Sequence, residues 1–81
     1  MMNAYTIKAM IEDYSEKRDK AIDDKTDALD WLEFLTKSII KDGDSYTTQD
    51  LVNQTAYLQE LDELIYECNK QIILLSEILG E

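Results

Sequence analysis

The chain has 81 residues, with 18 acidic and 8 basic side chains, no histidine, no proline and one cysteine. Its net charge of −10 argues against direct binding to nucleic acid or to an anionic membrane, since both attach through cationic surfaces. A single thiol without histidine builds neither an intrachain disulfide nor a zinc site. We therefore expect one domain over residues 1–81, with no metal and no cofactor.

A first helix is expected over about residues 4–41. Apolar side chains recur along it in alternating steps of four and three residues, the period of a coiled-coil-like seam. Its seam positions are Ile7, Ile11, Tyr14, Arg18, Ala21, Lys25, Ala28, Leu32, Leu35 and Ile39. Residues 23–27 are poor or moderate helix formers, so a break there is an open alternative, which the continuous period disfavours.

A turn is expected over residues 42–47, where aspartates and a glycine cluster, followed by a second helix over about 48–79. Thr47 or Thr48 is suited to cap the start of this helix, and Gly80 to end it. The same alternating period gives its seam positions, which are Leu51, Gln54, Leu58, Leu61, Ile65, Cys68, Ile72, Leu75 and Leu79.

Two arms of nearly equal length joined by a short loop predict an all-α fold, a long antiparallel helical hairpin. In this register Lys25 lies opposite Ile65 and reaches Asp62, while Arg18 lies near Ile72. Such pairs would specify the register more than they would add stability.

Large apolar side chains also flank the seam, and a lone hairpin would leave them exposed. We therefore expect two hairpins to pack as a four-helix-bundle homodimer, with part of this surface binding a partner as the alternative. The predicted oligomer interface is Trp31, Phe34, Tyr57, Leu64, Leu74 and Ile78. Trp31, Phe34 and Tyr57 are expected to cluster near the loop.

Acidic side chains recur every three or four residues on the first helix, opposite the seam. They are Glu12, Glu16, Asp19, Asp23, Asp27, Asp30 and Glu33. One interpretation is a solvated face with ordinary helix pairs such as Asp13–Lys17, Glu16–Lys20 and Glu33–Lys37. The other is that a row of carboxylates imitates a nucleic-acid backbone and docks on a basic groove, which makes these seven residues the predicted partner-binding site.

The sequence offers few means of catalysis. Without histidine, and with two glycines, it builds no Ser-His-Asp or Cys-His site and no glycine-rich phosphate loop. Glu60-Leu61-Asp62-Glu63 resembles half of the magnesium-binding ExxE…ExxD pattern of the MazG-type nucleotide pyrophosphatases, which implies metal-dependent nucleotide hydrolysis. The matching ExxD does not follow it. In its small size, acidity and helical composition the chain resembles host-takeover and anti-defence proteins of bacteriophages.

The function favoured by the sequence is therefore binding rather than enzymatic catalysis. We expect a cytoplasmic protein that docks on a basic, nucleic-acid-binding protein and inhibits it. The alternative is a structural or assembly adaptor whose rod mediates oligomerisation, and a nucleotide pyrophosphatase is a third hypothesis. No membrane association is expected, because the longest apolar run is far shorter than the roughly 20 residues that span a bilayer.

Overall fold

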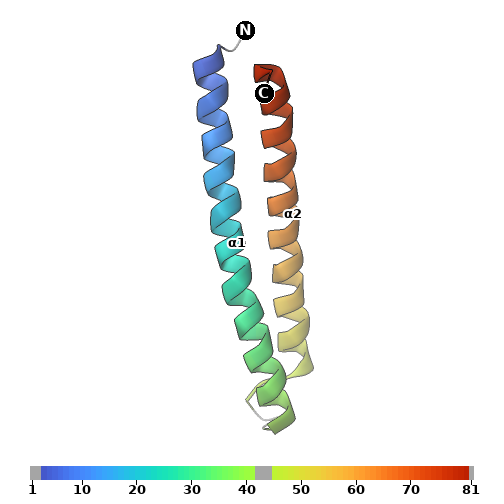
Figure 1. The fold of residues 1–81 in the computed structure, drawn as a ribbon. Helices are drawn as coiled ribbons and strands as arrows, with labels where there is room; N and C mark the ends of the chain where they lie inside the picture. Colours follow the sequence, from blue (N-terminus) through green and yellow to red (C-terminus); the bar gives the residue numbers. More distant parts are fainter. Residues whose placement is uncertain (1–2, 42–44, 81) are drawn as a thin grey trace.

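The computed structural model describes residues 3–41 and 45–80, which form two helices, α1 (Ala4–Lys41) and α2 (Thr48–Leu79). The helices pack side by side and antiparallel, so the start of α1 and the end of α2 lie at the same end of the molecule (Figure 1). The resulting rod measures 58 × 16 × 15 Å. The all-α helical hairpin predicted from the period is thus confirmed for the part of the chain that the structure describes.

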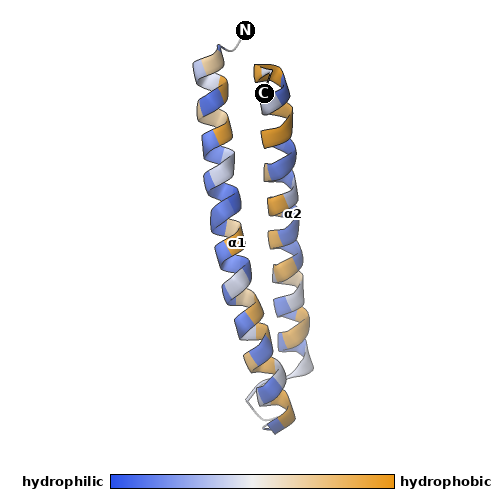
Figure 2. Ribbon diagram, viewed as in Figure 1, coloured by the Kyte–Doolittle hydropathy of each residue, from blue (hydrophilic) through white to orange (hydrophobic). Residues whose placement is uncertain are grey.

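The seam holds the two helices together. Every buried side chain among the described residues occupies a predicted seam position, namely Ile7, Ala21, Ala28, Leu35, Leu58, Leu61, Cys68 and Leu75. The remaining seam positions are half-buried. α1 is mostly hydrophilic through its middle, whereas α2 carries more hydrophobic residues (Figure 2). Neither described helix is long and apolar enough to cross a membrane.

α1 continues without interruption through residues 23–27, so the break that the sequence left open does not occur. Ala21 and Ala28, 1% and 4% exposed, belong to one core cluster with Leu58 and Leu61 of α2. Because this packing holds the helix on both sides of the weak stretch, tertiary contacts outweigh the low local propensity.

The ends of α2 follow the predicted chemistry. The Thr47 backbone N–H donates to the Asp50 carboxylate at 2.7 Å, and the Asp50 N–H donates to the Thr47 carbonyl at 3.0 Å. Gly80 adopts the left-handed conformation with φ of 82° that closes the helix, as expected. Residues 42–44 of the expected turn lie outside the described residues.

Polar side chains on one side of the rod show the register of the two helices. Lys25 forms the predicted ion pair with Asp62. Arg18 Nη1 donates a hydrogen bond at 3.3 Å to Asn69 Oδ1, one turn nearer the loop than the predicted neighbour Ile72. The aliphatic stems of both cations lie along the seam while the charged groups reach its edge, which avoids the cost of burying a charge.

Candidate functional site

The seven carboxylates predicted to bind a partner form a continuous row on α1, here called the acidic stripe. All seven residues are exposed: Glu12, Glu16, Asp19, Asp23, Asp27, Asp30 and Glu33. Since α1 is unbroken between the first and last of them, the row extends for about 30 Å along a single helix. The structure therefore brings together on one side the residues that the sequence assigned to the site.

Little of this negative charge is neutralised within the chain. Asp19 pairs with Arg18 at 3.1 Å and Glu33 pairs with Lys37 at 2.9 Å. Within residues 3–41 and 45–80, no salt bridge involves the other five members of the acidic stripe. They are consequently available to the cations of another molecule.

Two lysines beside the acidic stripe behave differently from the expected helix pairs. Lys20 bridges to Asp24 at 3.1 Å rather than to Glu16, and Lys17 lies over the Tyr14 ring with its Nζ 5.5 Å from the centroid. A lysine on a helix can pair with a carboxylate four residues before it or four residues after it. The sequence spacing is the same for both, so it does not predict whether Lys20 pairs with Glu16 or with Asp24. Glu16 therefore stays without the predicted pair.

Hydrogen bonds shift the pKa values of two exposed groups near the acidic stripe. The bond from Lys37, together with the charge of that lysine, holds the pKa of Glu33 below its ordinary value. The bond to Asp24 likewise raises the pKa of Lys20. Both shifts favour the charged forms, so Glu33 keeps its negative charge to a lower pH than an isolated glutamate does.

The predicted oligomer interface also forms one face of the rod. If each seven-residue repeat of a helix is lettered a to g, the seam occupies positions a and d. The six residues of the predicted oligomer interface then all lie at g or c. Trp31, Tyr57, Leu64 and Ile78 are at g, and Phe34 and Leu74 are at c. Each is between 41% and 64% exposed. Asp62 and Asn69, which bridge to α1, occupy e, so this surface lies on the opposite side of the seam. We call it the Trp31 face.

An aromatic cluster occupies the loop end of the Trp31 face, but its membership differs from the prediction. Trp31 stacks on Phe34 with ring centroids 5.0 Å apart, and Tyr46 lies edge-on to both rings at 5.9 Å. Among the described residues, ring contacts with this pair come from Tyr46 and not from the expected Tyr57. The sequence did not predict a role for Tyr46. This residue precedes α2, and the helical period predicts the side to which a side chain points only within a helix.

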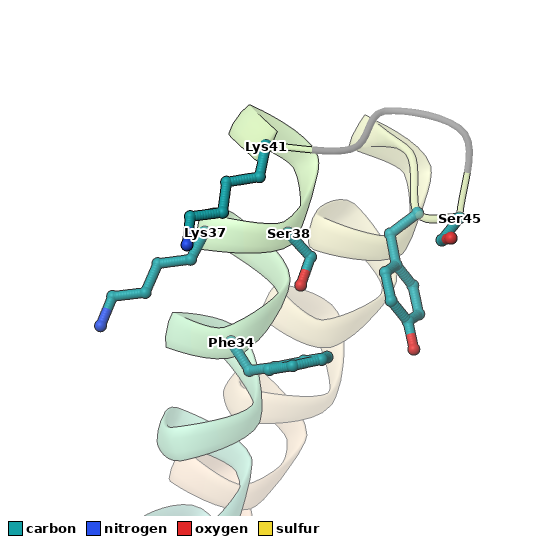
Figure 3. Close-up of a pocket in the computed structure, with 6 residues that line it drawn as sticks. Phe34, Lys37, Ser38, Lys41 and Ser45 are labelled. Carbon is teal, nitrogen blue, oxygen red and sulfur yellow. The ribbon is translucent and has the colours of Figure 1, made fainter.

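A hollow of about 490 Å³ adjoins this cluster. It is lined by Phe34, Lys37, Ser38, Lys41, Ser45 and Tyr46 (Figure 3). Figure 3 shows the ammonium groups of Lys37 and Lys41 extended away from Phe34 and Ser38. The two cations therefore do not converge on an anion within the hollow.

A second set of exposed apolar side chains lies at the e and b positions, across the seam from the Trp31 face. It consists of Ile22, Leu29, Ile40, Val52, Tyr66 and Ile73, between 43% and 80% exposed. We call this surface the Leu29 face. From the sequence, all of these residues except Tyr66 belong to the apolar flanks expected to be covered in a dimer or by a partner, but none is among the six residues of the predicted oligomer interface.

Glu60 and Glu63, the pair that resembles a magnesium motif, are exposed on α2. In the part of the chain that the structure describes, no three Cys, Asp or Glu side chains come together as metal ligands. Comparison with family models, curated proteins and solved structures finds no match to the chain. Its function is therefore argued from its own surfaces.

Proposed function

We propose that the chain is a non-catalytic binding protein whose acidic stripe docks on a basic, nucleic-acid-binding protein and inhibits it by occupying the nucleic-acid site. The observation that carries this proposal is the row of seven exposed carboxylates along one unbroken helix. Five of the seven have no salt bridge within the described residues. A rigid row of unpaired negative charges attracts a cationic groove and accelerates association with it.

The proposed active unit is a homodimer in which two Trp31 faces pack together as a four-helix bundle. Supporting this, Trp31, Leu64 and Leu74 are 43%, 45% and 44% exposed in the single chain. Covering these side chains removes apolar surface from water and leaves the acidic stripe on the outside, except for Asp27, which lies at a c position near Trp31. We further propose a cytoplasmic location, where the free thiol of Cys68, buried in the seam, stays reduced.

Charge reversal on α1 tests the acidic stripe. The immobilised protein is used to capture partners from a cell lysate, and binding of each captured protein is then measured by interferometry. The variant Glu16→Lys/Asp19→Lys/Asp23→Lys/Asp30→Lys should weaken binding at least tenfold, because it turns attraction into repulsion. Binding by the natural sequence should also weaken as salt rises, since screening limits exposed charges to roughly 8 Å at physiological ionic strength.

The matched control instead reverses three exposed acids that lie outside both the acidic stripe and the acidic hollow lined by Glu63 and Glu67, namely Asp13, Glu60 and Glu77. This control changes the net charge in the same direction and by a similar amount, and should reduce binding much less. Both variants should keep their helical circular dichroism, because exposed substitutions usually change the unfolding free energy within about 0.5 kcal/mol. Equal losses in the two variants would show that only net charge matters, and undiminished binding by the α1 variant would refute the proposal.

An assembly adaptor is the second candidate, favoured by the large exposed apolar area of the Trp31 face. The two functions differ in their response to salt. Binding through apolar surfaces is insensitive to moderate salt or strengthened by it, whereas binding through the acidic stripe weakens.

A further inference from the structure

The Leu29 face is unusual for the outer surface of a strongly charged rod, because its side chains are mostly apolar or neutral. Ile22 and Leu29 of α1 are 43% and 47% exposed, and Tyr66 and Ile73 of α2 are 66% and 59% exposed. The register shown by the Lys25–Asp62 pair brings Ile22 approximately level with Tyr66, so the apolar surface crosses from one helix to the other.

Threonines increase the apolar character of this face. The hydroxyls of Thr26, Thr36 and Thr55 each donate to the carbonyl four residues earlier in the same helix, at 3.1, 2.8 and 2.8 Å. All three residues occupy e or b positions. Because the hydroxyl protons are satisfied within the helix, the methyl groups are the part of these side chains left for contact with another molecule.

Three shallow hollows follow one another along the α2 edge of this face. The first, of about 320 Å³, includes Val52 and Thr55 in its lining. The third, of about 240 Å³, has mainly apolar walls and is lined by Tyr66, Asn69, Lys70, Ile73 and Leu74. The second, of about 400 Å³, lies between them and is lined by Asp62, Glu63, Tyr66 and Glu67. Along this edge an acidic hollow therefore lies between two mainly apolar hollows. Together they extend over about 30 Å, which equals the length of an α-helix of about 20 residues.

The opposite edge of the face is acidic. Glu12, Asp19 and Glu33 occupy b positions of α1, with Asp19 one turn before Ile22 and Glu33 one turn after Leu29. The nearby cations Arg18 and Lys25 are already engaged with Asp19 and Asn69 and with Asp62, respectively. Lys8 and Lys70 are exposed toward the end of the rod distant from the loop. Asp19 and Glu33 pair with Arg18 and Lys37, but exposed pairs of this kind contribute little stability, so cations of an occupant can exchange with them. An occupant of the middle of the face is thus offered apolar surface between two acidic edges.

We infer that the Leu29 face is the docking site for a cationic amphipathic helix presented by the basic partner. The apolar side of that helix would lie over Ile22, Leu29 and Ile73, and its lysines and arginines would pair with the acidic stripe on one edge and with the acidic hollow around Tyr66 on the other. This inference rests on the proposed function and names the chemistry of the partner segment.

Charge complementarity also distinguishes this occupant from a second copy of the chain. Two Leu29 faces packed together would bring their acidic edges, with Glu12, Asp19 and Glu33, toward one another, and like charges in an interface are unfavourable. On the Trp31 face the α1 carboxylates at c and g positions are interspersed with lysines, so two copies of that face do not oppose rows of a single sign. These residues are Asp13, Lys17, Lys20, Asp24, Asp27 and Lys41. The two faces therefore take different occupants.

The test uses two synthetic peptides of about 20 residues, a length set by the rise of a helix. One places leucines on one helical face and lysines on the other, and the second has the same composition in scrambled order. Binding to the full chain is measured by fluorescence anisotropy. The uncharged variant Ile22→Gln/Leu29→Gln removes the apolar surface without altering charge, and Tyr57→Gln/Leu64→Gln is the matched control on the Trp31 face, of similar exposure.

The amphipathic peptide should bind at least tenfold more tightly than the scrambled one. Ile22→Gln/Leu29→Gln should weaken it at least tenfold, and the control at most twofold. Equal affinity for the two peptides, an equal or greater loss in the control, or no loss in Ile22→Gln/Leu29→Gln would each overturn the inference. So would a fall in sedimentation mass caused by Ile22→Gln/Leu29→Gln, because a second copy would then be the occupant.

The four-residue reversal of the acidic stripe separates this inference from the proposed function. If that reversal abolishes peptide binding while Ile22→Gln/Leu29→Gln does not, the acidic stripe acts without the Leu29 face and only the further inference fails. If the reversal leaves peptide binding unchanged, the pairing of the peptide's lysines with the acidic stripe is refuted. The proposed function is then decided separately, by the effect of the same reversal on the captured partner.

Discussion

Arg18 and Lys25 occupy positions where a seam ordinarily carries apolar side chains. Their side chains remain 30% and 37% exposed, because the stems are long enough to bring the charges to the edge of the helix pair. Partly exposed ion pairs contribute about 0–1 kcal/mol, so the Lys25–Asp62 pair adds little stability. The placement of Arg18 and Lys25 has a larger effect on where the charges of α1 lie. Because these two cations occupy seam positions, the outer side of α1 is left acidic.

At the scale of single residues, we predict that Glu33 titrates at lower pH than an ordinary glutamate. Its pKa is lowered by the hydrogen bond and charge of Lys37, so the pair is present at neutral pH and is lost as the pH falls through the titration of Glu33. Carboxyl-carbon NMR of the natural chain and of Lys37→Gln measures the shift. The midpoint should rise in Lys37→Gln and stay unchanged in Lys20→Gln, and an unchanged midpoint in Lys37→Gln would contradict the assignment.

At the scale of elements, the two helices depend on different parts of the sequence. α2 has a defined start and end, supplied by Thr47, Asp50 and Gly80. α1 has a start closed by the Asn3 side chain, which accepts the Thr6 N–H at 2.8 Å, but a weak middle. Its continuity comes from buried Ala21 and Ala28, which shows why local propensity alone left a break open.

The start of α2 gives a prediction for this element. Asp50→Ala removes the acceptor of the Thr47 N–H and a negative charge from the first turn, so the unfolding free energy should fall by about 1 kcal/mol. Urea denaturation followed by circular dichroism measures the change. The control Asn53→Ala removes only an exposed bond from Gln49 at 2.9 Å and should change the free energy within about 0.5 kcal/mol. Equal losses would mean that the cap is not stabilising.

At the scale of the whole molecule, two features determine what the rod can do. It is thin, 58 × 16 × 15 Å, and both sides beside the seam carry exposed apolar residues. A two-helix rod has one internal contact surface, so it cannot bury both sides itself. We therefore propose that the Trp31 face and the Leu29 face are covered by molecules from outside the chain.

We predict that analytical ultracentrifugation gives a mass near twice that of the chain. Leu64→Glu/Leu74→Glu should shift the molecule to the monomer, because it introduces charge into the Trp31 face at positions 45% and 44% exposed in the single chain. Ile22→Glu/Leu29→Glu should leave the mass unchanged. A natural chain that is monomeric at micromolar concentration would reassign the Trp31 face to partner binding.

The sequence by itself was sufficient to predict two seam-packed helices, the capping of α2 and the Lys25–Asp62 pair. These follow from helical period and capping chemistry, which act locally, and from arms of equal length, which leave one simple antiparallel register. It also predicted the exposed acidic stripe, because the spacing of residues determines the side of a helix on which they lie.

Only the tertiary structure decided which contacts these residues make. It placed Tyr46 against Trp31 and Phe34, paired Lys20 with Asp24, directed Arg18 to Asn69 and kept α1 continuous. The physical reason is that the direction of a residue outside a helix, and the choice between equally spaced partners, depend on neighbours supplied by distant parts of the chain. Helical period specifies the side on which a residue lies, whereas packing specifies what it touches.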